Sequence, residues 1–550
     1  MEEVDPCSGY CSRSRTYHSL RPNSPIPPQS LPISLTDFLL SNLPTSNHPL
    51  PFLVDDSTGA TLSYSDFLSL SDTLSLSLIS RYPSLSKSHL AFLLSPNSLH
   101  LPLLYFSLLS LGVVLSPGSP LGSPSEIRHQ LLLSRPSIAF ATSSTSHKLP
   151  REMFPLGVVL IDSPEFASML TRHHPPRPLL ENVNGVVQSD TATVLYSSGT
   201  TGRVKGVVMS HRSMIAALSR FYNPSNAAVD TGKVVLLNLP MFHVYGMFMM
   251  FRAFAGGKTL VLWTEVKKFD VVGMLRVVER YKVNVLPASP PVVVAMLKVR
   301  REEREKLDLK SLMTVGSGGA PLGKEISTGF QEKFPRVTLL QGYALTESLL
   351  GAGMLSPDEA TRQGSVGRLA EDMEAKVVDP STGESLPPGL KGELWLRGPA
   401  IMTGYLGDDK ATAETLGPDG WLKTGDLCYF DKDGFLYILD RLKELIKYKA
   451  YQVPPAELEQ LLLSNPAITD AAVVPYPDEE AGEIPMAFVV RKPGSTITEH
   501  QVMDFIAEQV SPYKKIRRVS FVDSIPKTPS GKILRRELRE RAVSGSASKL

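Results

Sequence analysis

Cysteine is scarce in this 550-residue chain, and its scarcity excludes a fold held together by disulfides. The three cysteines, Cys7, Cys11 and Cys428, are too few to crosslink a protein of this size, which indicates a reducing compartment. Cys7 and Cys11 have the spacing of half a zinc site, but no second Cys/His pair stands nearby to complete it. We therefore interpret both as free thiols.

Net charge and long apolar runs are also lacking. The 57 Lys and Arg residues nearly cancel the 55 Asp and Glu residues, so neither nucleic acid nor an anionic membrane is expected as the main partner. The longest apolar run, residues 101–115, contains Pro102 and falls short of the ~20 residues that a membrane-spanning helix needs. The acidic residues 1–5, with no apolar stretch after them, argue against a secretory leader.

The chain does have the alternation of an α/β protein, and its length predicts at least two domains. Residues 1–35 are rich in Ser, Pro and Arg without periodicity, which predicts a poorly ordered leader. Residues 36–440 alternate apolar runs with helical stretches and predict a large α/β domain with mainly parallel sheets. The candidate strands there are residues 90–94, 138–141, 158–161, 234–239, 259–262 and 283–286, and residues 101–111 form a candidate helix.

From about residue 390 the pattern changes to strict alternation bounded by Gly and Asp, as at 391–397 and 435–438. With a hairpin turn at 431–434, it predicts a small antiparallel sheet or barrel. Residues 441–550 then mix helices with strands, which predicts a compact α+β C-terminal domain.

A Ser-, Thr- and Gly-rich loop follows the apolar run that ends at Tyr196. Its sequence over residues 197–206 is SSGTTGRVKG, and the glycine spacing and Gly206 after Lys205 differ from a Walker loop. Backbone N–H groups and hydroxyls can surround phosphate oxygens, and a lysine can neutralise their charge. The predicted phosphate contacts are Ser197, Ser198, Gly199, Thr200, Thr201, Gly202 and Lys205.

The chain ends in Ser548-Lys549-Leu550, a tripeptide that reads as a peroxisomal targeting signal. The small, polar residues before it, 542–547, favour an exposed signal. We therefore expect a peroxisomal import receptor as a partner and the peroxisome as the location.

The loop at 197–206 resembles the phosphate loop of the adenylate-forming superfamily of acyl-CoA synthetases, luciferases and adenylation domains. Further family motifs follow in order, and within the family the chain is most similar to plant 4-coumarate–CoA ligases and their peroxisomal relatives. These motifs are LPMFH at 239–243, GGAPL at 318–322, QGYALTE at 341–347, WLKTGD at 421–426, RLKELIK at 441–447 and PKTPSGK at 526–532. The resemblance implies a large N-terminal domain with a small barrel-like subdomain, followed by a mobile C-terminal lid.

The resemblance also implies which residues bind ATP, Mg²⁺ and coenzyme A. Tyr343 would stack on adenine and Thr346 would contact the α-phosphate. Glu347 would hold Mg²⁺, while Asp426 and Arg441 would bind the ribose. Taken alone, Asp426 is typical of a turn residue after a glycine. Further cofactor contacts are expected at Gln341, Gly342, Lys268, Lys443, Lys449 and Ala450.

The resemblance implies catalytic roles for Lys532, Lys447, Gln452, His243 and Glu347. The Lys532 ammonium would stabilise charge as a carboxylate attacks the α-phosphorus. Lys443 matches the family's hinge, and Lys447 and Gln452 match residues of the adenylation and thioester steps. Lys449 and Ala450 match positions along the coenzyme A tunnel.

For the acyl pocket, the resemblance puts His243 at the carboxylate end, although a lone His in an apolar run is more often a core residue. Phe248 and Met249 stand where polar side chains are common in the family, and Gly351 and Ala352 stand where bulkier residues are common. These differences predict a larger cavity. The remaining substrate contacts are expected at Tyr245, Gly319 and Met354.

Three residues depart from the family pattern: Val204 replaces a proline, and Ala344 and Ala450 replace glycines. A positive φ at Ala344 would cost about 1 kcal/mol.

The expected activity is an ATP-dependent carboxylate–CoA ligase acting on 4-coumarate-like phenylpropanoid acids or on bulkier fatty and oxylipin acids. Two alternatives stay open. One is an adenylate-forming enzyme with luciferase-like oxygenation or carrier loading as its second step, and the other is a non-catalytic nucleotide-binding relative.

Overall fold

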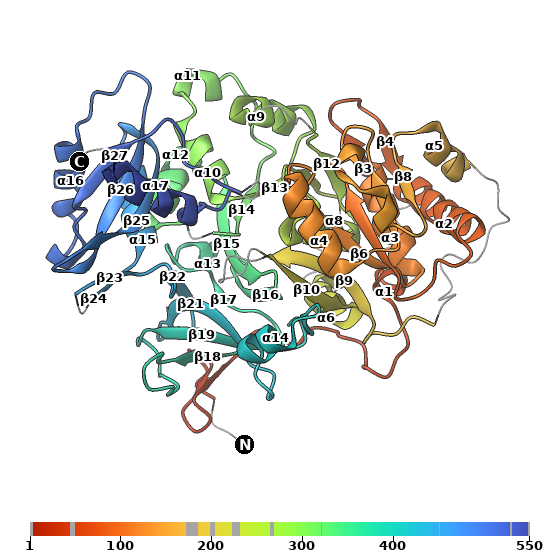
Figure 1. The fold of residues 1–550 in the computed structure, drawn as a ribbon, viewed down its shortest axis with the longest axis horizontal. Coiled ribbons are helices and arrows are strands. Elements are labelled where there is room, and N and C mark those ends of the chain that lie inside the picture. Colours follow the sequence, from red (N-terminus) through yellow and green to blue (C-terminus); the bar gives the residue numbers. More distant parts are fainter. Residues whose placement is uncertain are drawn as a thin grey trace.

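The computed structural model describes residues 4–43, 50–171, 185–197, 204–222, 232–264, 269–320, 322–449, 451–528 and 531–547. Within these residues the strands form four sheets with helices packed around them (Figure 1). The α/β fold class expected from the sequence is confirmed. Among the described helices, none combines the length and the apolar character needed to cross a membrane.

The first large sheet is built around β5, whose five residues are all buried. β5 runs parallel to β6 and β7, and β7 runs parallel to β8, as the short apolar runs predict. The strand order is β20 (Gly404–Tyr405), β10 (Lys205–Ser210), β9 (Thr191–Ser197), β6 (Val114–Pro117), β5 (Leu90–Leu94), β7 (Ile138–Ala141) and β8 (Val158–Leu160).

The second large sheet carries the parallel strands whose carboxyl ends reach the site described below. The order is β17 (Arg368–Leu369), β16 (Ser348–Gly353), β15 (Thr338–Leu345), β14 (Thr314–Ser317), β13 (Val285–Ala288), β11 (Val234–Leu237), β12 (Thr259–Leu262), β3 (Pro51–Asp55) and β4 (Thr61–Ser63). β11 to β15 are parallel, and β15 then turns back into β16 as an antiparallel hairpin. In open parallel sheets, ligands bind beyond the carboxyl ends of the strands.

The third sheet is antiparallel, as predicted for the region after residue 390. Its order is β1 (Tyr10–Cys11), β2 (Thr16–His18), β18 (Glu374–Val378), β19 (Gly392–Arg397), β21 (Leu422–Phe430) and β22 (Leu436–Arg441). β1 and β2 lie beside β18 and β19 at the bottom of Figure 1.

The prediction of a poorly ordered leader over residues 1–35 is therefore wrong for residues 10–18. Tyr17 is buried, stacks on Phe430 with ring centroids 4.2 Å apart, and donates a hydrogen bond to the Leu386 carbonyl. Composition did not indicate that residues 10–18 are well ordered, because the strands that pair with them lie more than 350 residues later in the chain.

The fourth sheet uses only residues after 445. Its order is β24 (Tyr451–Val453), β23 (Ile446–Tyr448), β26 (Gly482–Arg491) and β25 (Ile468–Asp478), and β27 (Arg518–Phe521) pairs with β26. A cluster of buried apolar residues from the same segment packs beneath it. This is the α+β arrangement predicted after residue 440, drawn in blue at the left of Figure 1.

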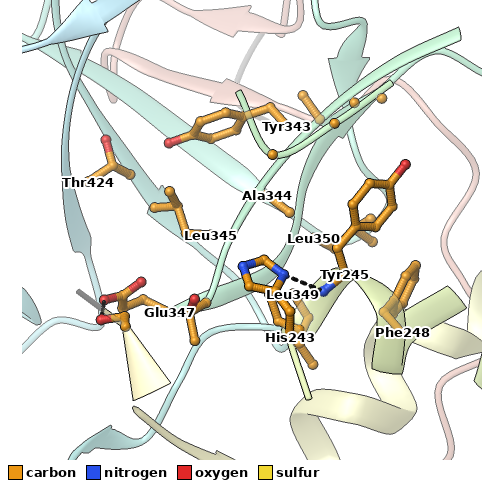
Figure 2. A pocket seen from close by; sticks show the side chains of 18 of the residues that line it. His243, Tyr245, Phe248, Tyr343, Ala344, Leu345, Glu347, Leu349, Leu350 and Thr424 are labelled. Atoms are coloured by element: carbon orange, nitrogen blue, oxygen red, sulfur yellow. Dashed lines mark hydrogen bonds between the residues drawn. The ribbon is translucent and has the colours of Figure 1, made fainter. Parts of the chain in front are cut away.

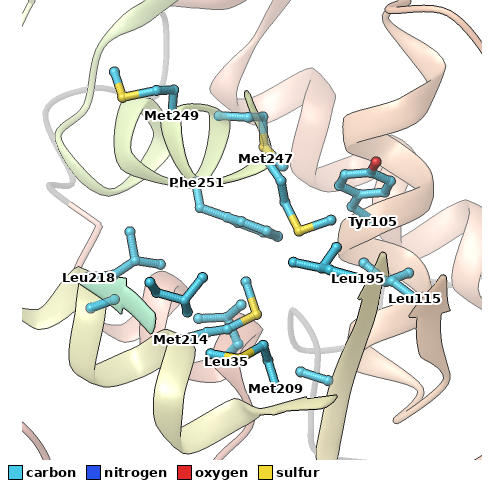
Figure 3. Packing of buried hydrophobic residues seen from close by; sticks show 14 of the residues in the cluster. Leu35, Tyr105, Leu115, Leu195, Met209, Met214, Leu218, Met247, Met249 and Phe251 are labelled. Atoms are coloured by element: carbon cyan, nitrogen blue, oxygen red, sulfur yellow. The ribbon is translucent and has the colours of Figure 1, made fainter. Parts of the chain in front are cut away.

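Helices cover the large sheets, and α8 packs against α6 through a methionine-rich contact (Figure 3). Met247 and Phe251 on α8 point toward Met214 and Leu218 on α6, whereas Met249 points away from α6. The α-helices are α1 (Leu35–Ser41), α2 (Tyr64–Arg81), α3 (His100–Ser110), α4 (Pro124–Ser134), α5 (Pro164–Thr171), α6 (His211–Ser219), α8 (Val244–Ala255), α9 (Val271–Arg280), α10 (Pro290–Lys298), α11 (Arg301–Arg304), α12 (Lys324–Lys333), α13 (Pro357–Ala360), α14 (Asp409–Thr415), α15 (Pro455–Ser464), α16 (Glu499–Ala507) and α17 (Arg535–Ala547).

Candidate active site

A cavity of about 680 Å³ opens at the carboxyl ends of β14 and β15. Its walls come from parts of the chain that are far apart in sequence, including the start of β10, the start of α8, the β15–β16 hairpin and the loop before α17. The expected site residues that line it are Ser197, Lys205, His243, Tyr245, Met249, Gly319, Gln341, Gly342, Tyr343, Thr346, Glu347, Ala352, Met354, Arg441, Lys443 and Lys532.

One side of the cavity is organised around the buried carboxylate of Asp426. The hydroxyl of Tyr343 donates to Oδ2 of Asp426 at 2.5 Å, and Nε of Arg441 lies 2.9 Å from Oδ1. Asp426 and Arg441 face each other in the β21–β22 register, so the sheet itself sets their separation. Burial raises the pKa of the Asp426 carboxyl, and Arg441 opposes this shift.

Lys532 enters the same cavity from the C-terminal segment. Its backbone N–H donates to the Thr528 hydroxyl at 3.1 Å. Gly531 has φ +87°, and a Cβ there would lie 3.1 Å from Cγ of Pro291, so Gly531 lies against the start of α10. Burial, reinforced by the charge of Arg441, lowers the pKa of the Lys532 ammonium.

Glu347 anchors a second polar cluster. Ser197 Oγ and Tyr405 Oη donate to the same oxygen, Oε1 of Glu347, at 2.9 and 3.0 Å. The Lys205 ammonium lies 4.4 Å from the centroid of the Tyr405 ring. Among the described residues, no three His, Cys, Asp or Glu side chains are grouped to hold a metal ion. One carboxylate fits Mg²⁺, because this ion is usually held by one or two carboxylates together with substrate phosphates and water.

His243 caps the N-terminus of α8, and its Nδ1 accepts the backbone N–H of Tyr245 at 3.3 Å (Figure 2). Burial lowers the pKa of His243 to about 4, so the imidazole is neutral near pH 7. The Tyr245 hydroxyl donates to the Gly316 carbonyl at 3.0 Å, which ties α8 to the end of β14. A neutral N–H donor and a fixed phenol fit the carboxylate end of an acyl pocket.

Most of the expected acyl residues form an apolar wall near these groups. Phe248, Met249 and Ala352 line the cavity, and Figure 2 shows Phe248 on the same side as Tyr245. Gly319 lines it with φ +88° and open space at its Cβ position. Sulfur of Met354 accepts the backbone N–H of Gln341 at 3.4 Å.

Gly351 differs from its expected place in the acyl wall, because the Tyr343 ring fills the space above it. A Cβ at Gly351 would lie 2.9 Å from Cδ1 of Tyr343 and 3.0 Å from its carbonyl oxygen. The missing side chain makes room for the candidate adenine-stacking ring and does not enlarge the acyl pocket. At Ala344 the backbone avoids positive φ, so the replacement of glycine there carries no such strain.

Three expected site residues lie away from the cavity. Lys447 and Gln452 are exposed and face each other across the β23–β24 hairpin. Lys449, also exposed, pairs with Glu480 at 2.8 Å. The positions Ser198, Gly199, Thr200, Thr201, Gly202, Lys268, Ala450 and Ser548-Lys549-Leu550 are outside the residues that the structure describes.

The sequence patterns missed three residues at the cavity: Tyr405, Arg220 and Arg252. Tyr405 contacts Glu347 from β20, which pairs with β10. None of the three stands in a motif considered above, so only their placement in space marks them.

Comparisons with known proteins agree with this geometry. The "AMP-binding enzyme" family model matches residues 45–406, and the "AMP-binding enzyme C-terminal domain" model matches residues 457–532. The chain is 54% identical to 4-coumarate–CoA ligase-like 9 of Arabidopsis thaliana, with 100% of this chain and 98% of that protein covered. It is 43% identical to peroxisomal OPC-8:0-CoA ligase 1 of the same plant, over 99% of this chain and 100% of that protein.

A crystal structure of the anthranilate CoA ligase AuaEII in complex with anthranoyl-AMP has the same fold. The TM-score is 0.84 at 23% identity, with 94% of this chain and 98% of that chain covered. The chain therefore belongs to the adenylate-forming AMP-binding enzyme family, among relatives named 4-coumarate–CoA ligase-like proteins.

Proposed function

We propose that this chain is an ATP-dependent carboxylate–CoA ligase. It joins an acid to ATP as an acyl-adenylate with release of pyrophosphate, then passes the acyl group to the thiol of coenzyme A with release of AMP. The observation that carries the proposal is one cavity that brings together Lys532, Arg441, Glu347 and His243. The CoA-ligase names of the relatives support it.

In the first step, a carboxylate oxygen of the acid bonds to the α-phosphorus and the bond to pyrophosphate breaks. Two anions meet, so a positive charge beside the phosphorus lowers the barrier, and Lys532 supplies it. The Tyr343 ring offers a face for adenine, Thr346 offers a hydroxyl to the α-phosphate, and Asp426 with Arg441 receives the ribose hydroxyls.

Glu347, with the hydroxyls of Ser197 and Tyr405 beside it, is the residue that would hold Mg²⁺. The ion would neutralise charge on the phosphates. The two hydroxyls fix the orientation of the carboxylate, and Lys205 adds a second cation on the same side of the cavity.

In the second step, the thiol sulfur bonds to the acyl carbonyl carbon and AMP leaves. Lys447, Gln452 and Lys449 lie on an exposed hairpin, so they reach the adenylate only after the C-terminal segment turns. We assign the turn to Lys443, which lines the cavity between Arg441 and that hairpin. A hinge of a few residues lets one segment present two faces in succession.

The substrate class follows from the acyl wall. Phe248, Met249 and Ala352 give it an apolar, adaptable surface that accepts 4-coumarate-like acids and also bulkier fatty or oxylipin acids. A panel of 4-coumarate, medium-chain fatty acids and cyclic oxylipin acids tests this. Turnover of cinnamic acids alone would contradict the broader class.

The test separates the two half-reactions. Pyrophosphate release is measured with ATP, Mg²⁺ and each acid, and CoA-ester formation is measured from a supplied acyl-adenylate. Lys532→Ala is expected to slow pyrophosphate release by ~10²–10³-fold and to spare thioester formation. Lys447→Ala and Gln452→Ala are compared in the same two assays to separate their assigned steps.

Full pyrophosphate release by the Lys532→Ala variant, or no release with any acid, would overturn the proposal. An acyl-adenylate that forms normally but gives no CoA ester would point instead to oxygenation or carrier loading as the second step.

We also place the protein in the peroxisome, on the strength of Ser548-Lys549-Leu550 and the peroxisomal name of one relative. A fluorescent protein fused ahead of Met1 should colocalise with a peroxisomal marker. Removal of the last three residues should disperse it, and unchanged localisation would contradict this assignment.

A further inference from the structure

The acyl wall does not stay apolar along its whole length. Tyr245, Phe248, Met249 and Arg252 all line the cavity, and their spacing of i, i+3, i+4 and i+7 puts them on one face of α8. At the rise of an α-helix, Arg252 lies about 10 Å farther along this face than Tyr245. The face therefore begins at the His243 cap, continues through apolar side chains and ends in a guanidinium.

A second arginine lies at the same end of the cavity. Arg220 lines the cavity too, and its Nε lies 3.3 Å from Oε2 of Glu371. The ring of Phe221 is flanked by both cations, 4.7 Å from Cζ of Arg252 and 5.6 Å from Cζ of Arg220. The same ring lies 6.2 Å from the ring of Phe248, so the apolar wall and the two cations are continuous.

The buried guanidinium of Arg220 has a donor group that lacks a hydrogen-bond acceptor among the described residues. Only 6% of the residue is exposed, and its Nη2 has no hydrogen-bond partner among the described residues. A buried donor left without a partner costs about 1–3 kcal/mol, and more when it is charged. Burial lowers the pKa of Arg220 to about 10, which leaves it charged near pH 7.

Charged groups of both signs surround Arg220. Arg220 pairs with Glu371 and Arg21 pairs with Glu359 at 3.0 Å, while Arg252 adds a third cation to the same group. An oxygen acceptor from a ligand would satisfy the buried Nη2 donor of Arg220, which has no partner among the described residues.

From this arrangement we propose that Arg220 and Arg252 form a distal subsite that recognises an oxygen acceptor at the far end of an otherwise apolar acid. The preferred substrates carry a hydroxyl, carbonyl or second carboxylate remote from the carboxylate that is activated. The proposal rests on the carboxylate–CoA ligase function above and narrows its substrate class.

The test uses acids of one chain length that differ only at the far end: decanoic acid, its ω-hydroxy derivative and sebacic acid, the matching dicarboxylic acid. Pyrophosphate release gives kcat/KM, and calorimetry on the full chain gives Kd without need of turnover. The wild-type protein should favour at least one ω-oxygenated acid over decanoic acid by about 10-fold or more, the effect expected of a hydrogen bond to a charged group. The ω-hydroxy and dicarboxylic arms distinguish a neutral acceptor from an anionic one.

Arg252→Met keeps an unbranched chain beside Phe221 but removes the charge, and it should reduce this preference, in kcat/KM and in Kd, to near unity. Arg220→Lys keeps a buried cation opposite Glu371 but removes the planar fork, and it should reduce the preference in part. Arg276→Met, on the exposed face of α9, is the matched control and should preserve the preference.

Equal use of the three acids by the wild-type protein, or an unchanged preference in Arg252→Met, would overturn the distal subsite. Either outcome leaves the ligase function standing as long as decanoic acid still releases pyrophosphate. If none of the acids supported pyrophosphate release, the ligase function would be contradicted instead. The Kd values from calorimetry would still test the distal subsite.

Discussion

The hydroxyl of Tyr343 donates a hydrogen bond of 2.5 Å to Oδ2 of Asp426, the carboxylate that we assign to the ribose. The candidate adenine-stacking ring and the candidate ribose acceptor are therefore bonded to each other. If the ribose hydroxyls bind Asp426, they compete with Tyr343 for an oxygen atom. Ribose binding at Asp426 would therefore weaken or replace the Tyr343 bond.

Tyr343→Phe removes the hydroxyl and keeps the ring, so it separates the hydrogen bond to Asp426 from the proposed stacking on adenine. The variant loses a hydrogen bond to a charged group, so the free energy of unfolding should fall by about 1.5–3 kcal/mol in urea titrations. The KM for ATP should stay the same or fall, because binding no longer has to break that bond.

Tyr343→Ala is the contrast, since it also removes the ring. Base–aromatic stacking contributes about 1–3 kcal/mol, so the KM for ATP should rise by roughly 10-fold. An equal rise in Tyr343→Phe would show that the hydroxyl itself binds the nucleotide.

Gly351→Ala tests the role of the glycine beneath this ring. The added methyl would lie 2.9 Å from Cδ1 of Tyr343 and must displace it, so the KM for ATP should rise while the KM for the acid changes little. The control is Gly329→Ala, whose methyl meets open space on α12 and should add stability of about 1 kcal/mol without a kinetic effect. A rise confined to the KM for the acid would return Gly351 to the acyl wall.

Arg535→Met tests a buried ion cluster next to the catalytic lysine loop. Arg535 pairs with Glu444 at 3.0 Å and with Glu459 at 2.6 Å, so its removal leaves two enclosed carboxylates without their cation. Breaking a buried pair in this way costs about 3–5 kcal/mol. Thermal unfolding should show a clear loss of Tm.

Arg536→Met is the neighbouring control. Arg536 forms an exposed pair with Glu540 at 3.0 Å, and surface pairs contribute about 0–1 kcal/mol. Equal Tm losses in the two variants would mean that burial does not set the strength of the Arg535 cluster.

His243 should make stability depend on pH in acid. Burial lowers its pKa from 6.5 to about 4, so between these values the unfolded chain binds a proton that the folded chain does not. Stability contributed by the neutral His243 is complete above the unfolded pKa and is lost as pH falls toward 4. The full effect is about 3 kcal/mol.

His243→Asn should remove this part of the acid sensitivity and retain an N-cap for α8. The measurement is the free energy of unfolding near pH 7 and near pH 4 for both proteins. His211, also lowered to about 4 by burial, keeps its own contribution in each, so a smaller loss in the variant is expected and an identical loss would contradict the assignment.

Local pattern predicted the interior of the fold well, as two elements illustrate. The strand expected at residues 90–94 is β5, and the helix expected at residues 101–111 is α3 at His100–Ser110. Both are buried along most of their length, so hydrophobic runs report them directly. β1 and β2 were missed because their order comes from pairing with β18, which short-range composition does not record.

Motif order identified the candidate site, and the structure brought Ser197, Tyr343, Asp426 and Lys532 to one region. Their roles could be predicted from residue type, because hydroxyls, carboxylates and ammonium groups interact with phosphates in a limited number of ways. The sequence did not predict that Tyr405 contacts Glu347, because Tyr405 reaches Glu347 only through the pairing of β20 with β10.

The amino-acid sequence by itself determined the family, the α/β class and the identity of the chemical groups that face a nucleotide. Only the tertiary structure decided which of those groups share a cavity. It also decided that Gly351 leaves room for the Tyr343 ring, and that Arg220 and Arg252 lie at the far end of the acyl wall. The physical reason is range: residue type and periodicity reflect each residue's own burial, whereas contacts between distant segments depend on how the sheets and helices pack.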